Sequence, residues 1–204
     1  MNVEQMKEWI GRINDQIREK KAYLSDLDQA IGDGDHGANL ARGFTAAHLA
    51  ISEKDYEDCG ALLQDVSMAL LSKVGGASGP LLGTAFMKMA AAAKGNKELG
   101  KSEWGVLLQE AVGGIQLRGK AEPGEKTMLD VWQPAADYMK ENGKDASWSH
   151  FKSLCLEKME STKEMQATKG RASYLGDRSI GHLDPGAVSS CYILTALAEM
   201  EESL

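Results

Sequence analysis

Three aspartates that lie close together are the most distinctive chemical feature of this sequence. Asp28, Asp33 and Asp35 follow the pattern D-x-x-x-x-D-x-D, with glycines around them. Because glycine lets the backbone turn tightly, all three carboxylates can point at one place. Hard oxygen ligands of this kind suit Mg²⁺, which takes a few carboxylates and completes its shell with water and substrate phosphates. The spacing therefore predicts a metal–phosphate site.

Two further stretches carry residues that could serve the same site. His36 and Asn39 follow the aspartates directly. A nucleotide contact, a general base and a structural histidine all remain open interpretations of His36. Ser78 stands among small residues in GGASGPLLG, just before a helix expected to begin near Pro80. A helix N-terminus with bare amides is a natural phosphate site, and the alternative is that these glycines only allow close helix packing.

Three known ligand-binding motifs are partly matched in these loops, but each can be excluded. Gly32, Gly34 and Gly37 match G-x-G-x-x-G, but a helix precedes them instead of a strand, and two intervening positions are Asp, which would repel phosphate. The stretch GIQLRGKA is close to a P-loop, but Ala121 stands where the metal-binding hydroxyl must be. An EF-hand counted from the second aspartate would place Gly37 and Phe44 at ligand positions.

The apolar residues recur at spacings of three and four, which predicts helices, and no sustained strand alternation occurs. The fold class expected is all-α, in one domain over residues 1–204. The predicted helices cover residues 3–23, 39–51, 56–73, 80–94, 102–118, 126–142, 149–168 and 185–202. Glycine-bearing loops separate some of them, and these loops are expected to form one ligand-binding face of the bundle.

Composition narrows the class of protein further. Lys and Arg total 23 against 30 Asp and Glu, a formal charge of −7 that disfavours nucleic acid as a partner. The N-terminal segment is charged and no apolar run approaches the roughly 20 residues of a membrane span, so we expect a soluble cytoplasmic protein. Cys59, Cys155 and Cys191 are expected to be reduced buried thiols. His48 and His150 are expected to be structural.

Four blocks of the sequence resemble the DhaL family, the nucleotide-binding subunits of dihydroxyacetone kinase. They read LDQAIGDGDHGANLARGF, GGASGPLLGTAFM, PGEKTMLDVWQPAA and KGRASYLGDRSIGHLDPGAVSS, in family order. The resemblance implies an eight-helix antiparallel barrel, closed at one end, with the nucleotide at the loop-lined open end. It also implies that Asp28, Asp33 and Asp35 hold two Mg²⁺ ions that bridge to the phosphates of ADP or ATP.

The resemblance assigns nucleotide contacts in every block, and one more, Gly119, between the second and the third. These are His36, Gly37, Ala38, Asn39, Ala77, Ser78, Gly119, Met128, Arg171, Asp184, Pro185 and Gly186. Among them Arg171 is a basic contact expected to assist phosphoryl transfer beside the metal ligands Asp33 and Asp35. No side chain is assigned as a general base, because substrate activation is expected on a partner.

The chain has no room for the substrate-binding domain to which ATP-dependent kinases of this type fuse the nucleotide domain, so it resembles the free-standing form. That form implies two partners, the substrate subunit DhaK and the phosphohistidine-bearing phosphotransferase-system subunit DhaM. Bound ADP then acts as a coenzyme: it accepts a phosphoryl group from DhaM and passes it to dihydroxyacetone on DhaK.

Other functions stay open at this point. One is a non-enzymatic sensor of nucleotide state that binds a transcription regulator. Another is the same kinase role for a different small ketose, such as an erythrulose-like sugar. A fatty-acid branch of similar domains is disfavoured, because it resembles DGDTGTN where this chain reads DGDHGAN. A homodimer is a further candidate assembly.

Overall fold

This computed structural model describes residues 1–203. They form nine α-helices and three short 3₁₀ helices joined by loops, with no β-strand. The prediction of an all-α fold is confirmed. The α-helices are α1 (Val3–Glu19), α2 (Lys21–Ile31), α3 (His36–Ser52), α4 (Cys59–Lys73), α5 (Ser78–Ala92), α6 (Lys101–Gly119), α7 (Leu129–Asn142), α8 (Trp148–Ser161) and α9 (Pro185–Glu202). The 3₁₀ helices are η1 (Gly143–Asp145), η2 (Thr162–Glu164) and η3 (Arg171–Ser179).

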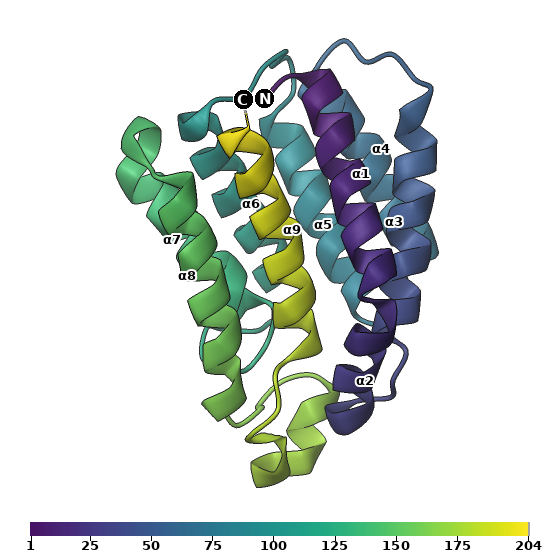
Figure 1. The fold of residues 1–204 in the computed structure, drawn as a ribbon, viewed down its shortest axis with the longest axis vertical. Helices are drawn as coiled ribbons and strands as arrows, with labels where there is room; N and C mark the ends of the chain where they lie inside the picture. The colour runs from purple at the N-terminus through teal and green to yellow at the C-terminus, as the bar shows by residue number, and fades with distance from the viewer. Residues whose placement is uncertain (204) are drawn as a thin grey trace.

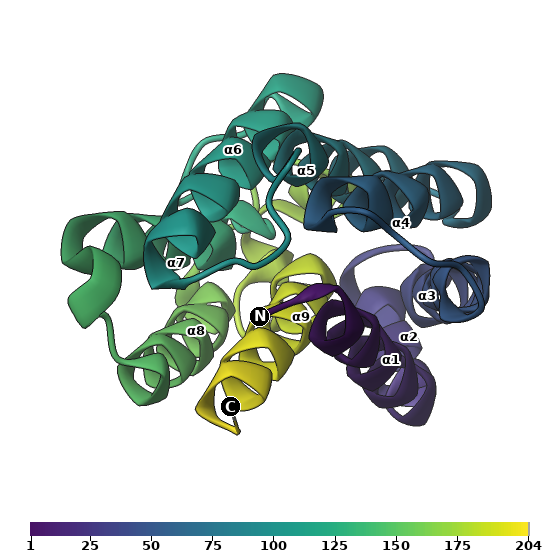
Figure 2. The same ribbon diagram turned by 90° about the horizontal axis from the view of Figure 1, so that it is seen from above.

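Eight of the α-helices pack side by side into a closed ring (Figures 1 and 2). α1 contacts α3, each helix from α3 onward contacts the next, and α9 returns to contact α1. Because the chain reverses at each connection, neighbouring helices run antiparallel (Figure 1). The connections that lead into α3, α5, α7 and α9 therefore all lie at one end, and both termini lie at the other.

Aromatic side chains fill the interior of the ring. Trp9 stacks on Phe86 at 5.9 Å between ring centroids and meets Trp104 edge-on at 5.4 Å. Phe44 packs edge-on against Phe86 at 6.4 Å. All four rings are buried, and the Trp9 indole donates a hydrogen bond to the carbonyl of Ile193. This cluster joins α1, α3, α5, α6 and α9, so it holds the helices whose ends carry the site.

The first helix was predicted to reach residue 23, which is wrong at its C-terminal end. α1 stops at Glu19, and α2 begins separately at Lys21. The buried residues of α2 are Leu24, Asp28 and Ile31, so a charged side chain stands at one of its few inward positions. Because this charge interrupts the apolar pattern, the sequence did not predict α2 as a separate helix. Its last turn carries Asp28, a candidate metal ligand.

Other predicted boundaries also differ from the structure, among them the starts of α4 and α7, which lie three residues later than predicted. α3 begins three residues before the predicted start at 39, because the Asp28 carboxylate accepts hydrogen bonds from the amides of Asp35 and His36. The helix predicted to run to residue 168 ends at Ser161. There the buried Thr162 hydroxyl donates to the Met159 carbonyl and also accepts from the Asp184 amide. η3 was not predicted.

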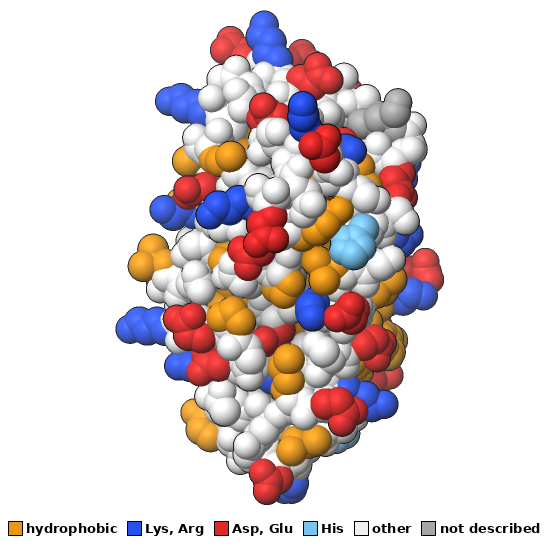
Figure 3. All heavy atoms as spheres, turned by 90° about the vertical axis from the view of Figure 1, so that its left-hand side faces the viewer, with side chains coloured by type: hydrophobic (Ala, Val, Ile, Leu, Met, Phe, Trp, Pro, Cys, Tyr) orange, Lys and Arg blue, Asp and Glu red, His pale blue; other side chains and the backbone are white. Residues whose placement is uncertain are grey.

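The cysteines and two of the histidines can also be compared with the sequence expectations. All three cysteines are free and buried. His150 packs on Tyr138 with ring centroids 4.8 Å apart, and His48 lies against Gly11. None of the helices in residues 1–203 is both long and apolar enough to span a bilayer. On the face shown in Figure 3, acidic and basic side chains are interspersed.

Close approach of α4 to α5 makes Gly60 a sensitive position. A Cβ there would lie 2.6 Å from the Ala90 carbonyl oxygen and 2.8 Å from the backbone of Lys94. We expect Gly60→Ala to lower the free energy of unfolding by about 1–3 kcal/mol through overpacking. Gly113→Ala is the control: this exposed site in α6 has nothing within 4 Å, and alanine should add about 0.5–1 kcal/mol. Urea unfolding followed by circular dichroism measures both, and equal shifts would contradict the packing argument.

Candidate functional site

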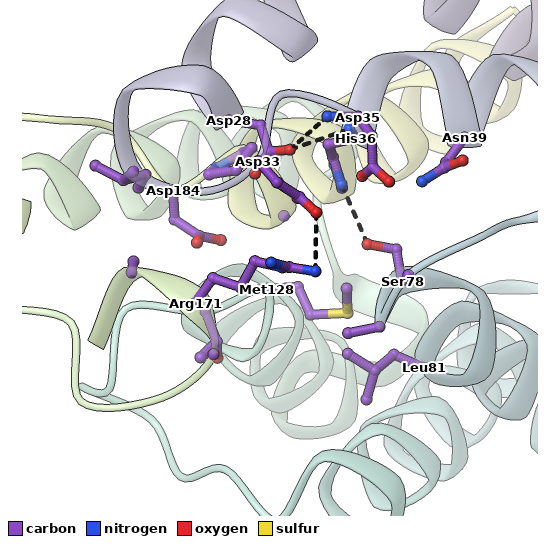
Figure 4. Close-up of a pocket in the computed structure, with 18 of the residues that line it drawn as sticks. Asp28, Asp33, Asp35, His36, Asn39, Ser78, Leu81, Met128, Arg171 and Asp184 are labelled. Atoms are coloured by element: carbon purple, nitrogen blue, oxygen red, sulfur yellow. Dashed lines mark hydrogen bonds and ion pairs between the residues drawn. The ribbon is translucent and has the colours of Figure 1, made fainter. Parts of the chain in front are cut away.

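A cavity of about 480 Å³ opens at the end of the ring where the four glycine-bearing loops meet (Figure 4). The predicted site residues that line it are Asp28, Asp33, Asp35, His36, Asn39, Ala77, Ser78, Met128, Arg171, Asp184, Pro185 and Gly186. A second, more apolar cavity of about 350 Å³ adjoins it, and Gly119 lines this one. The two share Leu81 and Met128, so together they offer a charged compartment beside an apolar one.

Two predicted contacts, Gly37 and Ala38, line neither cavity. Both lie in the first turn of α3, where backbone amides lack partners within the helix. A Cβ on Gly37 would come within 2.0 Å of the Lys21 carbonyl oxygen, so this glycine is required for α3 to pack on α2. Only the backbone of these two residues is suited to contact an anion.

The three aspartates do converge. One oxygen from each of Asp28, Asp33 and Asp35 lies within 4.8 Å of the others. Asp28 comes from α2 and is largely buried, while the other two come from the connecting loop and are exposed. Gly32 is needed because a Cβ there would lie 2.1 Å from an Asp28 carboxylate oxygen, and Gly34 turns the chain with a φ of +77°. An all-oxygen, acidic donor set of this kind fits Mg²⁺.

Two groups offset the charge of these carboxylates. One oxygen of Asp28 accepts hydrogen bonds from the amides of Asp35, at 2.9 Å, and His36, at 3.1 Å, so it faces the positive end of α3. The Arg171 guanidinium lies 2.8 Å from a carboxylate oxygen of Asp33 (Figure 4). Both partners of this ion pair are exposed, so the pair is weak and the arginine can change partner.

His36 is buried and hydrogen-bonded through both ring nitrogens. Its Nε2 lies 3.0 Å from the Ser189 hydroxyl, and its Nδ1 lies 3.1 Å from the Ser78 hydroxyl. Ser189 uses its one proton to donate to the Gly186 carbonyl, so it accepts from Nε2–H. Nδ1 is then the acceptor of the Ser78 proton. Burial lowers the pKa of His36, and a neutral ring matches this chain of hydrogen bonds.

The geometry favours some interpretations of His36 and Ser78 over others. With both ring nitrogens hydrogen-bonded to serines, His36 is placed to orient the Ser78 hydroxyl. Ser78 is the first residue of α5, and its hydroxyl oxygen faces the cavity while its proton points at His36. Gly79 is also needed for packing, because a Cβ there would lie 2.2 Å from the Val74 carbonyl oxygen. The small residues of this loop therefore allow close packing and also leave the Ser78 hydroxyl open to the cavity.

Asp184 is the most perturbed acid at the site. It caps α9 by accepting a hydrogen bond of 2.7 Å from the Ala187 amide. Burial raises its pKa to about 7; the nearby carboxylates of Asp130 and Asp28 act in the same direction, while the Ala187 amide and the Lys126 ammonium lower it. A group that gains a proton this readily is placed where an added cation would restore its charge.

Several lining residues were missed by sequence reasoning, namely Ile31, Gly75, Gly76, Leu81, Lys126, Thr127, Lys169, Gly170 and Ala172. The signal for Lys126 was present, since a lysine followed by an apolar helix stood in a block that the resemblance had singled out. Ser189, which orients His36, carried no such signal.

Comparison with known proteins shows the family of this chain. The family model described as DAK2 domain matches residues 30–199. The chain belongs to the DAK2-domain family. A DAK2-domain relative from Listeria innocua, the ADP-binding subunit DhaL of PEP-dependent dihydroxyacetone kinase 1, is 43% identical over 199 residues, covering 96% of this chain and 95% of that one. The corresponding subunit of the PTS-dependent kinase of Lactococcus lactis is 45% identical over 193 residues, covering 95% of each chain.

A solved structure shares the fold of this DAK2-domain chain. The dihydroxyacetone kinase of C. freundii in complex with AMP-PNP and Mg²⁺ matches with a TM-score of 0.75 at 20% sequence identity. The match covers 95% of this chain and 33% of that kinase, so the chain spans about a third of its length.

Asp184→Asn should alter the dependence of stability on pH in the nucleotide-free protein. The folded-state pKa of Asp184, about 7, lies above its ordinary value of 3.8, so the folded protein binds the extra proton between these values. The free energy of unfolding contributed by this group therefore falls as the pH rises through this window. Asparagine can still cap α9 and does not ionise. As the pH rises through this window, the free energy of unfolding should therefore fall less in the variant than in the wild type. Parallel pH dependences in urea unfolding would contradict the assigned pKa.

Proposed function

We propose that this chain is the nucleotide-binding subunit of a cytoplasmic, phosphotransferase-system-dependent dihydroxyacetone kinase. It retains Mg-bound ADP as a coenzyme, receives a phosphoryl group from a DhaM-type phosphohistidine and passes it to dihydroxyacetone on a DhaK-type subunit. The observation that carries the proposal is the convergence of three carboxylates and Arg171 at one cavity, in a chain that is 41–45% identical over nearly its full length to several DhaL subunits.

Each part of the cavity suits one part of a Mg-nucleotide. Asp28, Asp33 and Asp35 are the residues that would hold the ions, and the proposal includes two of them. The bare amides of α3 and α5 suit phosphate oxygens. The adjoining cavity is lined mainly by apolar groups such as Leu81 and Met128, with Arg118 and Lys169 also present, and it suits the flat face of a base.

The chemistry asked of these residues is positioning and charge neutralisation. Mg²⁺, when bound, would supply most of the positive charge that neutralises the nonbridging phosphate oxygens. Arg171 reaches the same region from the opposite side, and leaving its exposed partner Asp33 costs about 1 kcal/mol or less. The guanidinium can therefore follow charge as it develops on the transferred phosphoryl group. His36 holds the Ser78 hydroxyl in place, and we assign no side chain of this chain as a general base toward the ketose.

The first experiment measures what the purified protein retains. Denaturation without added nucleotide should release about one ADP and two Mg²⁺ per chain. Asp35→Ala should weaken binding of Mg·ADP by more than about a hundredfold, because it removes a carboxylate from the ion site, while helical content stays unchanged. Asp26→Ala is the matched control, since Asp26 is an exposed acid on α2.

Either of two outcomes would overturn parts of this assignment. Full retention of ADP by Asp35→Ala would remove the metal assignment. A wild-type protein that carries no nucleotide and binds no Mg·ADP would remove the kinase function and favour a non-enzymatic partner of a regulator.

An exposed aromatic beside the cavity provides a test of partner contact. Tyr174 is 89% exposed on η3, three residues after Arg171, and the substrate subunit must approach this rim to receive the phosphoryl group. Tyr174→Ala should leave ADP content unchanged and lower the rate of transfer at limiting substrate subunit by about tenfold, as loss of an aromatic interface anchor does. Val106→Ala, an exposed apolar residue near the start of α6, should have no effect. Equal rates for both variants would place the contact elsewhere.

A further inference from the structure

The segment from Lys163 to Asp184 forms a closed loop between α8 and α9, which we call the cap segment. The amide of Gly181 donates to the carbonyl of Lys163 at 2.8 Å and joins its two limbs at the base. Near its middle, residues 169–172 line the main cavity, and Lys169 and Gly170 line both cavities. In Figure 4, Arg171 of this segment faces Asp33 across the cavity. The cap segment therefore covers the side of the site opposite the acidic loop.

Lys126 connects both limbs of the cap segment from outside it. Its ammonium donates to the carbonyls of Met165 at 3.0 Å, Ser179 at 2.6 Å and His182 at 2.6 Å. Met165 belongs to the first limb, and the other two carbonyls belong to the second. Lys126 is 1% exposed, its contact with the Ser179 carbonyl is buried, and the other two contacts are partly buried. Three N–H donors exist only on the charged form of lysine, so the geometry requires the ammonium.

This saturation separates Lys126 from the phosphate-binding groups. Although it lines the cavity, its three donors all point to backbone carbonyls and none is left for a phosphate oxygen. Its backbone has a φ of +61°, in the left-handed region that a side chain rarely adopts. The structure keeps a lysine there because only a long cationic side chain can reach all three carbonyls.

The loop that carries Lys126 is itself fixed to α7. The buried Asp130 carboxylate accepts hydrogen bonds from the amides of Gly124, at 2.5 Å, and Thr127, at 2.7 Å. Lys126 lies between these two residues, so its backbone is held on both sides. A continuous set of polar contacts therefore runs from α7 through this loop to the cap segment.

Other contacts of the cap segment with the acidic loop and α2 are weak. Ala167 and Ala172 form a small apolar cluster with Ile31 at the end of α2. The ion pair of Arg171 with Asp33 is exposed on both sides.

The limbs also contact each other, because the Ala167 amide donates to the Ser179 hydroxyl at 2.8 Å and the Gln166 amide group donates to Asp177 at 3.0 Å. The Thr168 amide donates to the Glu125 carbonyl at 3.3 Å and ties the first limb alone to the loop before α7. Lys126 is the side chain that ties both limbs to that loop.

We propose that Lys126 is a positioning residue that holds the cap segment over the bound nucleotide and so sets how slowly the nucleotide leaves. The inference rests on the proposed function, in which ADP stays bound through successive rounds of phosphorylation. Slow release then depends on a contact that never touches the nucleotide. Removing the ammonium leaves one buried and two partly buried carbonyls without their donor, which weakens the attachment of both limbs to the loop before α7.

The test compares Lys126→Met with Lys163→Met. Methionine has a similar length without charge, and Lys163 is an exposed lysine of the same segment. The first readout is the release rate of a fluorescent ADP analogue in excess Mg²⁺, chased with ADP. The second is hydrogen exchange by mass spectrometry over residues 163–184. Lys126→Met should release the analogue about tenfold faster and exchange faster in the cap segment alone, whereas Lys163→Met should match the wild type.

Each other outcome is decisive. Faster exchange of the cap segment with an unchanged release rate would make Lys126 a purely structural residue and overturn the proposal. If Lys126→Met fails to fold, Lys126→Gln keeps two N–H donors and should show an intermediate release rate; a wild-type rate in that variant would also overturn the proposal. A wild-type protein that does not bind the analogue would overturn the proposed function and this inference together, whereas binding with unchanged release overturns only the inference.

Discussion

Crowding of like charge is the constraint on which the rest of this structure depends. Asp28, Asp33 and Asp35 bring carboxylate oxygens within 4.8 Å of one another, and two such charges at 4 Å repel by about 1 kcal/mol even in bulk water. Two contacts offset this repulsion: the positive N-terminal end of α3 lies against Asp28, and Arg171 forms an ion pair with Asp33. The negative charge that remains suits a divalent cation.

The ring of helices explains why four separate loops can line one cavity. Each helix runs opposite to its neighbours, so every second connection returns to the same end. The loops before α3, α5, α7 and α9 therefore meet there without any long excursion of the first three. The aromatic interior holds the ends of these helices in place, and a displacement of one helix would move one wall of the cavity.

Buried polar contacts then join these loops to one another. His36 links Ser78 at the start of α5 to Ser189 in α9, and Lys126 links the loop before α7 to both limbs of the cap segment. In a site shielded from water, a polar group without a partner is costly, so each link fixes the relative position of two loops. These links fix the loops that line the cavity.

The sequence by itself determined the helical class, because apolar spacing is a local property, and it determined the acidic motif, because its three carboxylates lie within eight residues. It also marked the helix N-terminus at Ser78 and, through family resemblance, Arg171 and Asp184. Tertiary structure alone decided the separate helix α2, whose inward positions include a charged residue.

Tertiary structure also decided the partners of His36 and Lys126. Ser189 lies 153 residues from His36, and the carbonyls that accept from Lys126 lie 39 to 56 residues away. A backbone carbonyl has no identity in the sequence, and a serine in a helix looks like any other until the helices pack. The physical reason is that such contacts are chosen by the closure of the ring, which brings distant backbone and side-chain groups into a space that water does not reach.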